Sequence, residues 1–124
     1  MKALCRSWLL VVFLSGWLSA LVTAQIATVI PDTEAAEHVG QKATVEGTVV
    51  AVFTSSKGNT FINFGGKYPH QTFTGYIPAD SALAGGGSSL GGLEGKRIKI
   101  TGTIDLYKGK PEIKVTSKDQ LVLE

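Results

Sequence analysis

Two long runs of β-forming residues, each interrupted by one glycine, most constrain the fold of this 124-residue chain. The first extends from Lys42 to Phe53 around Gly47, and the second extends from Lys96 to Asp105 around Gly102. A glycine inside a strand usually marks a bulge or a sharp bend. A small closed barrel needs such bends where long strands coil from one side to the other. The sequences flanking the two glycines are similar, but five matching positions are too few to support an internal duplication.

Three shorter segments alternate between apolar and polar residues and complete the predicted set of five strands: Thr60–Phe64, Gln71–Ile77 and Glu112–Thr116. Alternation places successive side chains on opposite faces of a strand. It does not say which face is buried. We expect Ile62 and Phe64 to point inward, which leaves Phe61 and Asn63 exposed.

Two other segments interrupt the strands. Pro31 to His38 is typical of a short helix, which Asp32 or Thr33 could cap and Gly40 could end. The stretch Gly85–Gly92 predicts a flexible, glycine-rich connection between the third and fourth predicted strands. The predicted order is therefore helix, three strands, connection and two strands.

The first 24 residues have the pattern of a secretory signal peptide. Lys2 and Arg6 precede an almost wholly apolar run, Trp8–Val22, and we predict cleavage between Ala24 and Gln25. An uncleaved membrane anchor is the alternative. The apolar run is shorter than the roughly 20 residues that cross a bilayer, which favours cleavage, with residues 25–124 forming one domain.

Cleavage would change the charge of the protein. The whole chain has 12 basic and 10 acidic residues, a formal charge of +2 that hints at a polyanionic partner. Lys2, Arg6 and the only cysteine, Cys5, all belong to the predicted signal peptide. The mature chain would be neutral and free of disulfides. Its basic residues concentrate in 94–118, where seven of them accompany three acids.

Five strings of the sequence resemble small, exported bacterial proteins of the OB-fold, nucleic-acid-binding type: Ala43–Val50, Thr60–Gly65, Tyr68–Thr74, Gly95–Ile104 and Tyr107–Ile113. The resemblance covers about residues 34–122. It implies an all-β fold, a five-stranded Greek-key barrel that binds ligands on strands 2 and 3 and on the loops 1–2 and 4–5. Gly75 departs from the pattern because a bulkier residue is usual there, and we expect it to open or weaken the binding surface.

The residues that catalysis would need are scarce. His38 and His70 have no nucleophile near them in the sequence, and the mature chain has no cysteine to bind a metal. We interpret five acids as solvated surface charges: Asp80, Glu94, Asp105, Glu112 and Asp119. We therefore expect a protein that is not an enzyme and that uses neither a cofactor nor a metal.

Single-stranded nucleic acid is bound by aromatic rings that stack on bases and by cations along the backbone. The strands and loops that the resemblance assigns to binding contain seven candidates: Lys57, Phe61, Asn63, Tyr76, Tyr107, Lys108 and Lys110. The third predicted strand supplies Phe73 or Tyr76, depending on which face is exposed. Phe61, Phe64 and Phe73 could equally belong to the core.

Two functions follow from this. The first is binding of single-stranded DNA or RNA outside the cytoplasm, in the periplasm or after secretion. The alternative is an envelope module that binds a protein, peptide or saccharide partner through the same face. In both cases we expect a monomer that is not stably inserted in a membrane after cleavage.

Overall fold

The computed structural model describes residues 28–81, 83 and 90–124. The predicted signal peptide and most of the glycine-rich connection lie outside this range. Among the residues it covers, no helix has both the length and the apolar character that crossing a membrane requires.

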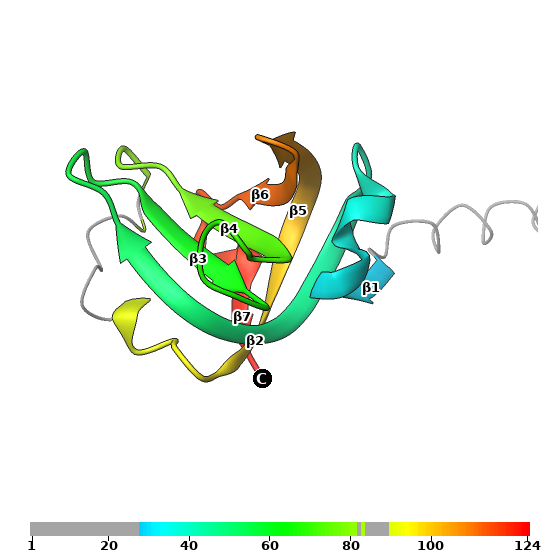
Figure 1. Ribbon diagram of the computed structural model, residues 1–124, viewed down its shortest axis with the longest axis horizontal. Helices are drawn as coiled ribbons and strands as arrows, with labels where there is room; N and C mark the ends of the chain where they lie inside the picture. Colours follow the sequence, from blue (N-terminus) through cyan, green and yellow to red (C-terminus); the bar gives the residue numbers. More distant parts are fainter. Residues whose placement is uncertain (1–27, 82, 84–89) are drawn as a thin grey trace, which may run out of the picture.

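The described chain is mostly β structure (Figure 1). Its elements are β1 (Thr28–Pro31), η3 (Asp32–His38), β2 (Lys42–Thr54), β3 (Thr60–Phe64), β4 (Phe73–Ile77), β5 (Arg97–Tyr107), β6 (Lys110–Lys114), η5 (Lys118–Gln120) and β7 (Leu121–Leu123). The five predicted strands correspond to β2 through β6. The predicted count of five was nevertheless wrong for the sheet as a whole, which has seven strands. The two additional strands, β1 and β7, are short edge strands that pair with β2 and β5, and they are too short for alternation to reveal them.

Five strands form a barrel-like partial ring. Their pairings run in the order β2, β3, β4, β6 and β5, and β5 pairs with β2 again. The link between β4 and β6 is parallel and has only three residue pairs, whereas the other links are antiparallel.

The two interrupting glycines lie where the long strands change partners. β2 pairs with β5 up to Thr48 and with β3 from Val49 onward, next to Gly47. β5 similarly exchanges β2 for β6 just after Gly102. A Cβ atom on Gly47 would lie 3.0 Å from Cδ2 of the buried Phe64 ring. The predicted bends are therefore present, and Figure 1 shows the strong curvature of β2.

The core fills the inside of the ring with aliphatic side chains and two phenylalanines. Ile62, Phe64, Phe73 and Ile77 are all fully buried. The rings of Phe64 and Phe73 meet edge to face, with centroids 5.3 Å apart, a favourable geometry for aromatic pairs. The predicted inward orientation of Ile62 and Phe64 is confirmed.

The predicted short helix is a 3-10 helix, η3, that packs against β1, β2 and β4. Its capping was predicted wrongly, because Pro31 occupies the N-cap position and no side chain caps the helix. Asp32 instead accepts a hydrogen bond from the hydroxyl of Thr72, just before β4. The helix is therefore held to the barrel by this contact and by the fully buried Ala35.

Candidate ligand-binding site

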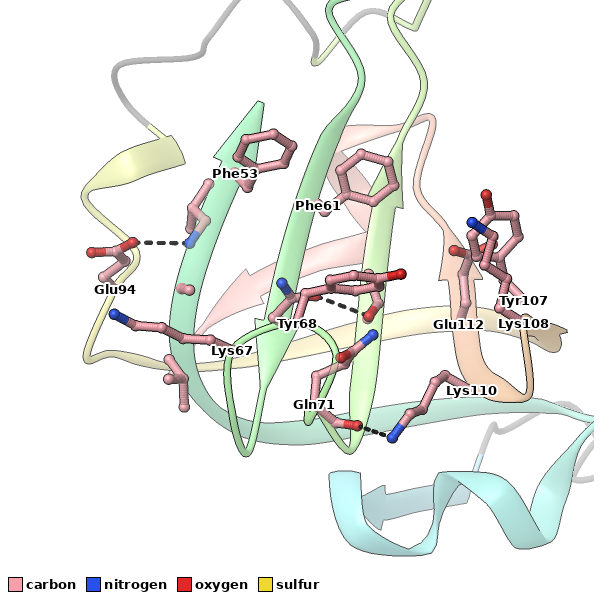
Figure 2. Close-up of a pocket in the computed structure, with 15 residues that line it drawn as sticks. Phe53, Phe61, Lys67, Tyr68, Gln71, Glu94, Tyr107, Lys108, Lys110 and Glu112 are labelled. Atoms are coloured by element: carbon pink, nitrogen blue, oxygen red, sulfur yellow. Dashed lines mark hydrogen bonds between the residues drawn. The ribbon is translucent and has the colours of Figure 1, made fainter. Parts of the chain in front are cut away.

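A cavity of about 670 Å³ opens on the outer face of β2, β3 and β4 and extends to the turn between β5 and β6 (Figure 2). Its size lies within the roughly 300–1,000 Å³ of typical ligand sites. Its walls comprise aliphatic, aromatic and charged side chains: Val50, Ala51, Val52, Phe53, Phe61, Asn63, Lys67, Tyr68, Gln71, Thr74, Glu94, Tyr107, Lys108, Lys110 and Glu112.

An aromatic row crosses three strands at this face. Phe53 of β2, Phe61 of β3 and Tyr76 of β4 are direct cross-strand partners. Their rings stack, with centroids 6.3 Å apart for Phe53 and Phe61 and 5.4 Å apart for Phe61 and Tyr76. Such cross-strand aromatic pairs stabilise a sheet. Phe53 is 60% exposed at the end of the row, so the row adds an apolar surface that solvent reaches.

A polar row lies two residues further along β3 and β4, on the same face, and continues onto β6. It consists of Asn63, Thr74 and Glu112, which are successive partners across β3, β4 and β6. The hydroxyl of Thr74 donates to Oδ1 of Asn63 at 3.0 Å. The prediction that Asn63 is exposed was wrong: it is only 4% exposed, because Thr74 and the surrounding strands enclose its amide.

The turn between β5 and β6 holds three of the predicted residues against the cavity. Tyr107 and Lys110 are partners across a two-residue loop, in which Lys108 and Gly109 have φ angles of 51° and 81°. Two successive positive φ angles define the type I′ turn that suits a tight hairpin. The Lys108 ammonium lies 5.4 Å from the Tyr107 ring centroid. Lys110 Nζ donates to the carbonyl of Gln71 at 3.3 Å.

The loop between β3 and β4 supplies three residues that the sequence reasoning missed. Lys67 and Tyr68 line the cavity, and Tyr68 is 64% exposed. Gln71 is buried beside them, and its Oε1 has no hydrogen-bond partner in the described part of the protein. The available signal was an aromatic residue next to a lysine between two strands, as also occurs at Tyr107 and Lys108.

Glu112 is half-buried, so its interpretation as a solvated surface charge was wrong. Burial raises the pKa of its carboxyl group, and the negative charge of Asp105, its partner on β5, raises it further. Within the described ranges the one ion pair is Arg97 with Glu124, at 3.6 Å. Glu94 is exposed at the surface, and it also lines the cavity and accepts a hydrogen bond from the Val52 amide at 2.9 Å.

A smaller cavity of about 170 Å³ adjoins the large one. Phe61, Tyr107 and Glu112 line both cavities, and Asn59 and Tyr76 line only the small one. The fold therefore brings six of the seven predicted residues to this joint site.

The structure places Lys57 and Gly75 differently from what the sequence predicted. Lys57, in the turn between β2 and β3, lines neither cavity. Gly75 does not open the binding surface, because it lies on the core side of β4. A Cβ atom there would lie 2.5 Å from Cδ1 of Ile100. Its small size therefore serves core packing, and the third strand presents Tyr76 rather than Phe73 at the site.

Comparisons with known proteins show the fold but no family. No protein-family model and no curated protein sequence matches this chain. Among solved structures, OBody AM1L10 bound to hen egg-white lysozyme has a TM-score of 0.56 at 12% identity, covering 82% of this chain and 98% of that one. OBody AM3L09, also bound to lysozyme, has a TM-score of 0.56 at 11% identity, covering 80% and 96%.

A third similar structure is a "putative aspartyl-tRNA synthetase" from Leishmania major Friedlin. Its TM-score is 0.55 at 13% identity, and the match covers 82% of this chain and 21% of the synthetase. This chain thus corresponds to about a fifth of that protein. Together the three similarities show that the chain has an OB-type, barrel-like β fold.

Proposed function

We propose that this protein is a non-catalytic binding module, a five-stranded Greek-key OB barrel that binds single-stranded DNA or RNA. The observation that carries the proposal is the position of two exposed tyrosines, Tyr68 and Tyr107, at one cavity. Each is followed or preceded by a lysine that lines the same cavity, Lys67 or Lys108. Rings that stack on bases, next to cations that contact phosphates, are what single-strand binding needs.

The charge of the cavity sets the expected strength of binding. Three lysines and two glutamates line it: Lys67, Lys108, Lys110, Glu94 and Glu112. Phosphate neutralisation supplies most non-specific affinity for nucleic acid. A cavity with so small a positive excess is therefore expected to bind weakly, with stacking as the larger contribution.

The test is titration of a labelled single-stranded oligonucleotide at several salt concentrations. We expect binding at low salt and a decline as salt rises. The double variant Lys67→Ala/Lys108→Ala should reduce the slope of log K against log salt by about 0.7 for each lysine–phosphate interaction that it removes. Both lysines are exposed, so the variant should fold normally.

A matched control is Lys42→Ala/Lys118→Ala, which removes two exposed lysines that line neither cavity. It should leave the salt slope unchanged. Absence of binding at low salt would contradict the proposed function. Equal effects of the two double variants would contradict the assignment of the cavity as the binding site.

A protein, peptide or saccharide ligand is the second candidate. It is favoured by the two glutamates in the cavity and by the lysozyme-bound state of the two similar OBody structures. Affinity capture from an envelope fraction would test it, using the wild type and Tyr107→Ala. Specific capture that this substitution abolishes, together with no oligonucleotide binding, would favour this candidate over the first.

Action outside the cytoplasm is part of the proposal and is supported by the signal-peptide pattern of residues 1–24. Mass spectrometry of the protein from an exporting bacterial host is expected to give an N-terminus at Gln25. An N-terminus at Met1 would contradict cleavage.

A further inference from the structure

The small cavity has the size and the walls of a slot for one planar aromatic group. Its volume of about 170 Å³ is well below the range of sites that enclose a whole small molecule. Three of its five lining residues are aromatic: Phe61, Tyr76 and Tyr107. It shares Phe61, Tyr107 and Glu112 with the large cavity, so one base of a longer ligand could enter it while the remainder occupies the large cavity.

The stacking order of the aromatic row determines which rings can receive a base. Phe61 stands between Phe53 and Tyr76 and stacks on both. Its two ring faces are therefore covered, and it can offer a ligand only its edge. Tyr76 ends the row, stacks on Phe61 alone among the described rings, and lines the small cavity together with Tyr107. Tyr76 and Tyr107 are thus the two rings available to contact a base there.

The polar groups of the slot have complementary roles. Glu112 is half-buried and, within the described residues, receives no hydrogen bond and has no ion-pair partner. Thr74 cannot supply one, because its hydroxyl hydrogen goes to Asn63. Asn59 uses its Oδ1 to accept from the Ala79 amide at 2.9 Å, which leaves its amide nitrogen to donate. The slot therefore presents carboxylate acceptors and one amide donor.

We propose that this slot holds a single nucleobase and that Glu112 makes it prefer guanine over thymine, an inference that rests on the proposed function. Guanine presents two adjacent donors, N1–H and the 2-amino group, with the acceptor O6 on the other side of N1–H. A carboxylate has two oxygens that accept in parallel, so Glu112 can receive both of these donors at once. Thymine places a carbonyl oxygen on each side of its single N–H, and these oxygens repel a carboxylate.

The test compares two labelled oligomers, an oligothymidylate and the same oligomer with one central guanine. We expect the wild-type protein to bind the guanine-containing oligomer roughly tenfold more tightly, as one good two-point base contact gives. Replacing that guanine by hypoxanthine removes the 2-amino group and keeps N1–H. This replacement should reduce the preference without abolishing it.

Glu112→Gln should abolish the preference, so that the two oligomers bind with equal affinity. The matched control is Glu94→Gln, which makes the same chemical change at another wall of the large cavity (Figure 2). Its new side-chain oxygen can still accept from the Val52 amide. Both variants remove one negative charge, so both can raise overall affinity, but only Glu112→Gln should change the ratio of the two affinities.

The outcomes separate this inference from the proposed function. If both oligomers bind equally to the wild type, or if Glu112→Gln keeps the preference, the slot assignment is overturned and nucleic-acid binding stands. If neither oligomer binds at low salt, the proposed function fails and the slot assignment fails with it. A guanine preference that Glu112→Gln removes and Glu94→Gln retains supports both.

Discussion

The inner and outer faces of β3 and β4 differ in what they contain. The inner face consists of Thr60, Ile62, Phe64, Phe73, Gly75 and Ile77. The outer face consists of Phe61, Asn63, Thr74 and Tyr76. Contacts between apolar side chains are sufficient to form the core of the barrel. An outer face needs only polar residues to be compatible with water. Two aromatic rings and a buried amide on the outer face are the groups that the proposed ligand binding would use.

The largest expected effect is a difference in unfolding free energy between variants of two phenylalanines on β3, Phe64 and Phe61. Phe64→Ala removes a fully buried ring from the core and should cost about 3–5 kcal/mol of unfolding free energy. Phe61→Ala removes a half-buried ring together with its stacking on two neighbours, about 0.5–1.5 kcal/mol for each aromatic pair. Urea denaturation of the two variants measures both values.

Phe61→Ala, the variant with the smaller expected loss of stability, is the one expected to affect binding. Phe61→Ala is expected to keep the fold and to weaken oligonucleotide binding, because Phe53 and Tyr76 lose the ring that aligns them. Circular dichroism would verify folding before the titration. Equal losses of stability in the two variants would show that the aromatic row is part of the core. The distinction between the inner and outer faces would then be contradicted.

Alternation along the sequence predicted which side chains share a face, but it could not predict what lies across from them. It placed Phe61 and Asn63 on one face and Ile62 and Phe64 on the other, but it did not determine which of the two faces points inward. The burial of Asn63 depends on its cross-strand partner Thr74, and a strand register is not visible in one sequence. The fold class was predictable because glycine positions and alternation are local signals.

Among the loop residues, the candidate site was predictable only where a turn is short. The hairpin of Tyr107 and Lys108 is fixed by two residues of turn, so its side chains stay near the sheet. Lys57 lies in a longer turn that ends outside both cavities. Glu112 was misjudged because its burial arises from its neighbours on β4 and β5, which are distant in the sequence.

A smaller effect is expected at Lys108, whose φ of 51° lies in the left-handed region that favours glycine and asparagine. Lys108→Asn would give the Asn-Gly pair that type I′ turns prefer. We expect it to raise the unfolding free energy by up to about 1 kcal/mol, and to weaken oligonucleotide binding by removing a cation from the cavity. Thermal unfolding and titration measure the two changes.

The matched control for this turn is Lys108→Ala, which removes the same charge but does not favour positive φ. It should weaken binding as much as Lys108→Asn does and should give no gain in stability. A stability gain in both variants would indicate that the lysine charge, rather than the turn geometry, is unfavourable. The turn at Lys108 would then be destabilised by the lysine charge and not by its backbone conformation.

The smallest effect concerns the stability of Glu112→Gln as a function of pH. Because burial and Asp105 raise the pKa of Glu112, the folded protein binds a proton here more readily than the unfolded chain does. Stability from this group is therefore present below the ordinary glutamate pKa of about 4.3 and is lost as pH rises through the folded-state value. Glu112→Gln should be more stable than the wild type at neutral pH.

This advantage of Glu112→Gln should shrink as the pH is lowered and vanish where Glu112 is protonated in both states. Denaturation midpoints of both proteins across the acidic range would show it. Glu94→Gln supplies the comparison, because the Glu94 carboxylate that it replaces accepts an amide hydrogen bond. A constant difference between wild type and Glu112→Gln at every pH would mean that Glu112 is as well solvated as a surface acid. Glu112 would then not be the partly desolvated carboxylate on which the placement of a base beside Tyr76 and Tyr107 rests.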